Sequence, residues 1–132
     1  MKITTKLLQQ KKACGDGLRW FNKHFPEGGD INSVLVMVLT DDDASKSWVS
    51  WLMTATKWTD LSFLKGLALT DLYLSGTQIT ALPEGLSVGG YLDLRGTQIT
   101  ALPEGLSVGG YLDLSGVNIT NIPAKFKSKI IH

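Results

Sequence analysis

The strongest constraint on the fold of this chain is a sequence unit that repeats without a mismatch. The stretch GTQITALPEGLSVGGYLDL fills residues 76–94 and returns unchanged at 96–114, a period of 20 residues. A degenerate copy stands upstream at 71–80, and the fragment SGVNITNIP follows at 115–123. A fixed period of this length is typical of stacked coils, none of which can bury its apolar face alone. We therefore expect the second half of the chain to form a short solenoid.

Within each unit, an apolar–polar–apolar alternation predicts a half-buried strand. It occurs at 72–74, 92–94 and 112–114, and we expect these strands to lie in parallel. Gly-Gly pairs before the second and third of them allow the chain to reverse direction. The predicted column of buried side chains between the strands contains Ile79, Leu82, Leu86, Val88, Ile99, Leu102, Leu106, Val108, Ile119 and Ile122.

The segment LDLRGTQITALPEGL resembles the leucine-rich repeat in its short bacterial form, whose units carry a Leu-Pro pair. The resemblance covers roughly residues 67–124 and implies an α/β fold with about three coils of parallel strands. One departure concerns the asparagine of that family, which is replaced here by Thr77, Thr97 and Val117. We expect a threonine hydroxyl to supply part of the missing backbone bonding, and we expect Val117 to leave the last coil looser.

The resemblance also implies that polar strand residues face the concave side, which is the common binding surface of leucine-rich repeats. Tyrosine offers a large contact area and a hydroxyl, and it is enriched at binding hot spots. Residues 67–124 hold five acidic side chains and one basic side chain, so a basic protein surface is the expected partner. The alternative is that duplication copied solvated residues that have no function. The predicted protein-binding residues are Tyr73, Tyr91, Asp93, Arg95, Tyr111 and Asp113.

Residues 1–60 lack the repeat and are predicted to form a helical N-terminal capping domain for residues 61–124, with residues 125–132 as a C-terminal cap. The first helix is expected to begin at Thr4 or Thr5 and to reach about Ala13.

Gly15 and Gly17 are expected to separate the first helix from a second helix at 17–24. Asp30 or Asn32 then caps an apolar segment that fits a helix or a strand.

Thr40 and the acidic triplet at 41–43 are expected to open a further helix, where carboxylates favour the helix dipole. The alternative interpretation of the triplet as a metal site lacks any further ligand pattern. The aromatic residues of this half are expected to be core: Trp20, Phe21, Trp48, Trp51 and Trp58.

The block KKACGDGLRWFNKHFPEGGDI, residues 11–31, resembles the openings of small phage- and prophage-encoded proteins. That resemblance implies a mobile-element origin and a role against host machinery, including CRISPR and other defence systems.

Catalytic constellations are missing from the sequence. Cys14 has Lys11 and Lys12 nearby, which favours a thiolate, but no base accompanies it, so we expect a buried or idle thiol rather than a cysteine-dependent enzyme. We predict no enzymatic activity, no cofactor and no metal. With a net charge of +1 and no apolar run long enough to span a bilayer, we also predict no membrane and no nucleic-acid partner.

We expect no secretory signal, and the single cysteine fits a reducing compartment, so the predicted location is the cytoplasm of a bacterial host.

These patterns together predict a non-enzymatic protein-binding module, phage- or prophage-encoded, that binds and inhibits a host protein complex, for example as an anti-CRISPR or other anti-defence inhibitor. The alternative is a structural or assembly protein that self-associates through the solenoid edge. In that case the C-terminal edge strand at 111–114 pairs with a second chain to give a homodimer. The tail AKFKSKIIH is expected to cover the last coil, with its lysines discouraging edge pairing.

Overall fold

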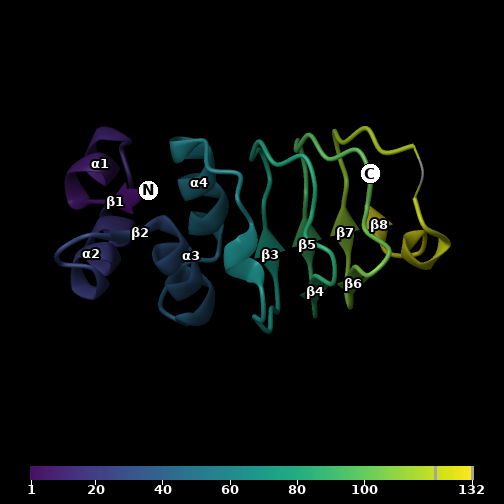
Figure 1. The fold of residues 1–132 in the computed structure, drawn as a ribbon, viewed down its shortest axis with the longest axis horizontal. Coiled ribbons are helices and arrows are strands. Elements are labelled where there is room, and N and C mark those ends of the chain that lie inside the picture. The colour runs from purple at the N-terminus through teal and green to yellow at the C-terminus, as the bar shows by residue number, and fades with distance from the viewer. Residues whose placement is uncertain (121, 132) are drawn as a thin grey trace.

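A computed structural model describes residues 1–120 and 122–131 of the chain. The fold is mixed α/β, with four α-helices in the described residues and with parallel sheets. Figure 1 shows the helices gathered at one end and the repeat strands following one another along the long axis. No helix among the described residues is long and apolar enough to cross a membrane.

The N-terminal half alternates short helices with one small antiparallel pair of strands. The pair, which the sequence analysis did not predict, joins Lys2 to Asp30 and Ile3 to Gly29. In chain order the elements are β1 (Lys2–Ile3), α1 (Thr5–Gln10), α2 (Gly15–His24), β2 (Gly29–Asp30), α3 (Ile31–Thr40), α4 (Ser47–Thr56) and the 3-10 turn η1 (Ser62–Leu64).

Side-chain caps set the starts of three of these helices. The hydroxyl of Thr4 accepts from the backbone N–H of Leu7, and the carboxylate of Asp30 accepts from that of Asn32, so both predicted caps are confirmed. Cys14 caps α2, where its sulfur accepts from the N–H of Gly17 at 3.3 Å.

Two predictions about these helices were wrong. Helix α1 ends at Gln10 rather than near Ala13, because Lys12 adopts a left-handed backbone with φ 62°. Gly17 lies inside α2 rather than breaking it, since the cap at Cys14 moves the helix start upstream. The apolar segment after Asp30 is a helix and not a strand.

The prediction that the acidic triplet opens a helix was also wrong. Asp41 ends α3 instead, and α4 begins at Ser47. The carboxylate of Asp41 accepts from the backbone N–H of Asp43 at 3.0 Å and from the indole N–H of Trp20 at 2.8 Å. The local bond to Asp43 and the long-range bond from Trp20 hold the triplet in a turn, and none of its three carboxylates lies at a helix N-terminus.

The repeat half forms two parallel sheets from strands of two residues each. One sheet has the order β3 (Leu72–Tyr73), β5 (Leu92–Asp93), β7 (Leu112–Asp113) and β8 (Ile130–Ile131). The other, which was not predicted, joins β4 (Ser87–Val88) to β6 (Ser107–Val108). Residues one period apart pair directly, as Leu72 does with Leu92, so the predicted parallel strands are confirmed.

The predicted column of aliphatic residues is buried from Ile79 to Val108, which lies on β6. Its last two members, Ile119 and Ile122, are only partly buried. The backbone bonding expected of the threonine hydroxyls is confirmed. Buried Thr77 and Thr97 each donate a hydroxyl hydrogen bond of 2.8 Å to the carbonyl three residues earlier. Val117, which has no hydroxyl, is only partly buried.

One apolar core runs through the chain from Ile3 to Phe126 and includes the contact between α4 and β3. The predicted boundaries at residues 60 and 124 stay predictions. They assign Asn121 to the repeats and His132 to the C-terminal cap, and these two residues lie outside the described part of the chain.

The C-terminal tail continues the sheet. Phe126 is buried, and Ile130–Ile131 pairs in parallel with β7 as strand β8. Strand β7 is therefore not an edge, and the homodimer predicted through residues 111–114 would have to use β8 instead. Lys125 and Lys129 donate to the carbonyls of Glu104 and Val108 and so attach the tail to the preceding unit.

Candidate binding face of the repeat sheet

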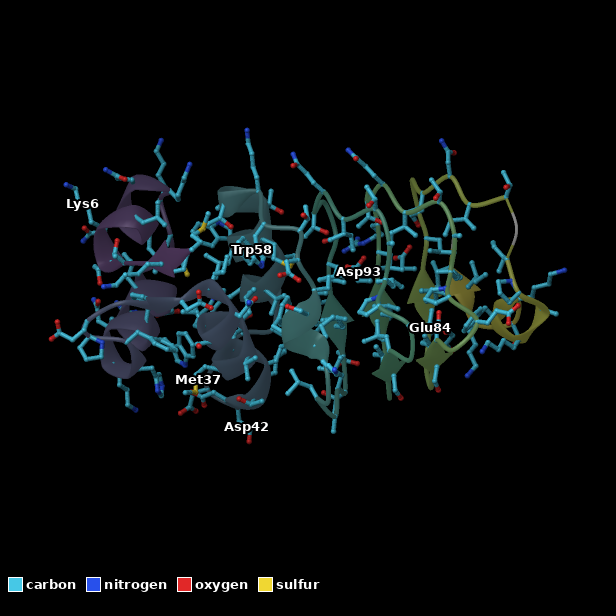
Figure 2. All side chains as sticks on the ribbon, viewed as in Figure 1. Lys6, Met37, Asp42, Trp58, Glu84 and Asp93 are labelled. Atoms are coloured by element: carbon cyan, nitrogen blue, oxygen red, sulfur yellow. The ribbon has the colours of Figure 1, made fainter. Side chains whose placement is uncertain are left out.

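The six predicted binding residues lie along the sheet that contains β3, β5 and β7. Because the strands are parallel and in register, Tyr73, Asp93 and Asp113 form one row across it. Figure 2 shows Asp93 among the strands, in contrast to Lys6, which points outward from the helical end.

The two aspartates do not present their carboxylates to solvent. Asp93 is 2% exposed and Asp113 is 6% exposed, so these two predicted protein-binding residues do not lie on the exposed surface. A buried carboxylate needs hydrogen-bond donors to offset the loss of hydration, and both aspartates find them within the chain. They support the surface from below rather than forming it.

Arg95 supplies the donors for Asp93. Its backbone N–H and Nε bond Oδ1 at 3.1 and 2.9 Å, and its Nη2 bonds Oδ2 at 2.8 Å. Nε also lies 3.7 Å from Oδ2 of Asp113. The hydrogen bonds and charge of Asp93 raise the pKa of the guanidinium, which stays cationic, with its side chain 55% exposed.

Asp113 has a different set of partners. Its Oδ1 accepts from the backbone N–H and the hydroxyl of Ser115 at 3.0 and 2.7 Å, and its Oδ2 accepts from the hydroxyl of Tyr91 at 2.9 Å. Burial acts to raise the pKa of Asp113, but the bonds from Ser115 and Tyr91 outweigh it and hold that pKa below its ordinary value. The side chain is therefore a carboxylate at neutral pH.

Tyr91 connects three strands. Its backbone N–H donates to Asp71 Oδ1 at 2.8 Å, and its ring lies 5.9 Å from the ring of Tyr73, between centroids. Burial, together with the hydrogen bond to Asp113, raises the pKa of Tyr91 to about 12. This tyrosine is held in place by the sheet and makes a rigid part of its surface.

Tyr111 stands in the same position of the next repeat but is 59% exposed. The residue paired with Asp113 on strand β8 is Ile131, which has no acceptor to offer a tyrosine hydroxyl. Ile131 is itself 40% exposed. We use the term tyrosine face for Tyr73, Tyr91, Arg95, Tyr111 and Ile131. Ile131 was not predicted from the sequence, although the alternation of Lys125, Lys127 and Lys129 with Phe126 and Ser128, followed by two β-branched isoleucines, could have indicated a further strand.

The tyrosine face combines phenol rings, of which that of Tyr91 is held by a hydrogen bond, with an exposed guanidinium and an exposed aliphatic side chain, and the carboxylates of Asp93 and Asp113 are buried. Among the described residues, no group of three His, Cys, Asp or Glu side chains could hold a metal ion.

The thiol and the histidine of the described residues lie away from this face. Cys14 is exposed at the start of α2. His24 Nε2 lies 3.1 Å from Asp41 Oδ2, next to the bond from Trp20, a cluster that the sequence analysis did not predict.

Residues 1–59 match the model of a bacterial family described as the YdhT N-terminal domain. The match spans the helical half of the chain, from β1 to the end of α4, and stops before the repeats. No match to the chain was found among the curated proteins or the solved structures.

Proposed function

We propose that the repeat half is a leucine-rich-repeat solenoid of the Leu-Pro type, and that the chain is a non-enzymatic protein-binding module whose contact surface is the tyrosine face. The period of 20 residues, the in-register parallel strands and the threonine bonds at the asparagine positions support the first part. Binding across a sheet surface then needs no catalytic group.

The observation that carries the proposal is the exposure of Tyr111. It is a large aromatic side chain, 59% exposed, with Ile131 exposed at the adjacent end of the sheet. Tyrosine and arginine are the residue types that most often dominate binding energy at protein interfaces. Here both lie next to strands that are paired on both sides, so little backbone freedom is lost when a partner binds.

The internal bonding of the face also changes the expected partner. Asp93 and Asp113 are buried and bonded, so they do not attract a basic surface as the sequence suggested. Arg95 uses Nε and Nη2 for Asp93, which leaves Nη1 for a partner. The complementary surface is therefore an apolar recess for Tyr111 beside a hydrogen-bond acceptor for Arg95.

The biological role that fits this proposal is inhibition of a host protein complex by a phage- or prophage-encoded protein, with anti-CRISPR or other anti-defence activity as the example. It rests on the resemblance of residues 11–31 and stays a prediction from the sequence.

The proposal is tested by affinity capture from bacterial lysate, with the native chain and a Tyr111→Ala variant compared by mass spectrometry. We expect the native chain to retain a protein that the variant releases, with a loss of affinity of about 30-fold, as for a hot-spot residue. Gln98→Ala is the matched control, because Gln98 is exposed in the same unit but outside the tyrosine face. Equal capture by Tyr111→Ala, with an unchanged melting temperature, would show that the tyrosine face is not the contact surface.

Self-association through β8 is a second candidate, favoured by the position of β8 as the last strand of its sheet in the described residues. The carbonyls of Lys129 and Ile131 bond β7, so in a parallel ladder the backbone groups of Ile130 face the other side. An Ile130→Pro variant removes the outward N–H. A dimer mass in solution that falls to the monomer mass in this variant would favour assembly over partner binding.

A further inference from the structure

The helical end contains a cavity of about 340 Å³ that has no part in the tyrosine face. Helices α1, α2, α3 and α4, which lie together at one end of the molecule in Figure 1, all contribute residues to its lining. The volume lies in the range of sites that bind small molecules. Most of the lining is apolar or aromatic, and the residues that matter for the argument are Lys12, Cys14, Gly17, Trp20, Trp48 and Trp51.

The aromatic part of the cavity is fixed at its base and open at its rim. Trp20 is buried, and its indole N–H bonds Asp41 at 2.8 Å, so its ring cannot turn. The ring of Trp48 lies 5.8 Å from it, between centroids, at an interplanar angle of 54°. Trp48 and Trp51 are only partly buried. Tilted indole rings with one open side make a receptor for a further flat apolar group.

Gly17 helps to keep this space open. A Cβ atom built on Gly17 would lie 3.7 Å from Cε2 of Trp48 and 3.4 Å from Sγ of Cys14. These are ordinary contact distances, so a side chain can be accommodated in the helix at this position only by occupying room beside Trp48. A glycine inside α2 costs about 1 kcal/mol of helix stability relative to alanine. At Gly17 the missing side chain leaves part of the cavity free.

The lining of the cavity carries positive charge and no negative charge among the described residues. Lys12 is the charged residue among the described side chains that line the cavity. It stands in the left-handed turn that ends α1 and brings residues 12–14 to the cavity wall. The nearest acidic residue in sequence, Asp16, is paired with Arg19. A ligand that enters among the indoles therefore meets a cation and no carboxylate from the lining.

We propose that this cavity binds a small apolar anion, with a flat ring packed against the open side of the indoles of Trp48 and Trp51, above buried Trp20, and with its acidic group at Lys12. The site belongs to the helical half and is independent of the tyrosine face. The ring supplies most of the buried apolar area, and the acidic group gives the direction of binding.

The test compares two fluorescent probes that share a fused aromatic ring system. One is 1-anilinonaphthalene-8-sulfonate, which carries an anionic group, and the other is N-phenyl-1-naphthylamine, which does not. We expect saturable binding of the anionic probe at one site per chain, and slower alkylation of Cys14 by iodoacetamide at saturation, because Cys14 lines the cavity.

Variants then separate the contribution of the Lys12 charge to probe affinity from that of the apolar cavity. Lys12→Gln is expected to lower the affinity for the anionic probe by about fivefold, the upper end for an exposed ion pair. The affinity for the neutral probe is expected to stay unchanged. Lys11→Gln is the matched control, since Lys11 is exposed and does not line the cavity. Equal effects of the two substitutions, or equal binding of the two probes by the native chain, would overturn the proposal.

Gly17→Leu tests the cavity itself. The leucine is expected to abolish binding of both probes while the melting temperature is retained or raised, because leucine favours a helix more than glycine does. This combination cannot result from unfolding. If Gly17→Leu fails to fold, Gly17→Ala adds a smaller side chain at the same contact distances, and a weaker affinity with a higher melting temperature is then expected. Undiminished binding in a folded Gly17 variant, or binding that does not saturate, contradicts the proposal.

Discussion

The buried hydroxyl of Thr97 gives a prediction that can be worked out from individual bonds. In Thr97→Val the side chain keeps its shape and loses one hydroxyl. That hydroxyl is buried, with Thr97 5% exposed, and donates to the carbonyl of Leu94 at 2.8 Å. The same carbonyl also accepts from the backbone N–H of Thr97 at 3.2 Å, so the substitution does not leave it without a partner.

The expected cost is therefore that of one net hydrogen bond, about 1 kcal/mol, rather than the larger cost of an orphaned buried carbonyl. For a chain of 132 residues, an unfolding entropy of about 2.1 cal/mol/K per residue converts this to a fall of about 4 °C in the melting temperature. Calorimetry or thermal denaturation followed by circular dichroism measures it directly.

The last unit provides the reciprocal experiment. Val117 occupies the equivalent position, and its backbone N–H already bonds the carbonyl of Leu114 at 3.0 Å. Val117→Thr adds the missing hydroxyl and should raise the melting temperature, by less than Thr97→Val lowers it, because Val117 is only partly buried. If Thr97→Val does not change the melting temperature, or if the two substitutions act in the same direction, the threonine hydroxyl does not hold the coil together.

Two further predictions concern the same half of the chain. The pKa of Tyr91, raised by burial and by Asp113 to about 12 from an ordinary value of 10.0, means that the unfolded chain ionises first as the pH rises. Stability present below pH 10 should therefore fall between about pH 10 and pH 12, and urea unfolding of Tyr91→Phe should lack that contribution. Gly109→Ala would place a Cβ against the carbonyl oxygen of Gly89, and we expect a loss of about 3 kcal/mol on denaturation. Gly105→Ala should cost less, because its closest contact is the movable side chain of Glu84 and the nearest backbone atom, the nitrogen of Gly85, is 3.3 Å away.

The repeat made much of the fold predictable from the sequence. Its period placed the strands at 72–74, 92–94 and 112–114 and the buried aliphatic residues between them, and the register confirms both. A repeating pattern is strong evidence because every copy must satisfy the same packing. The helix caps at Thr4 and Asp30 were also predictable, because a short polar side chain just before an apolar segment can accept a hydrogen bond from a backbone N–H of the first helical turn.

What the sequence could not supply were contacts between residues that are distant in the chain. Asp41 accepts from Trp20, 21 positions earlier, and this bond helps to turn the acidic triplet away from the helix start that its composition favours. Strand β8 likewise depends on pairing between Ile130 and Leu112. Neither local propensity nor the repeat period carries information about these partners.

The candidate site shows how identical sequences acquire different properties in a stack. Tyr91 and Tyr111 belong to copies of the repeat that do not differ at a single residue. Tyr91 finds Asp113 on the next strand, but Tyr111 finds Ile131 there. The first tyrosine is consequently bonded and partly buried, whereas the second is 59% exposed. The more exposed tyrosine therefore arises at the end of the duplicated series. A further identical repeat inserted after residue 114 should bury Tyr111 and expose the tyrosine of the new copy.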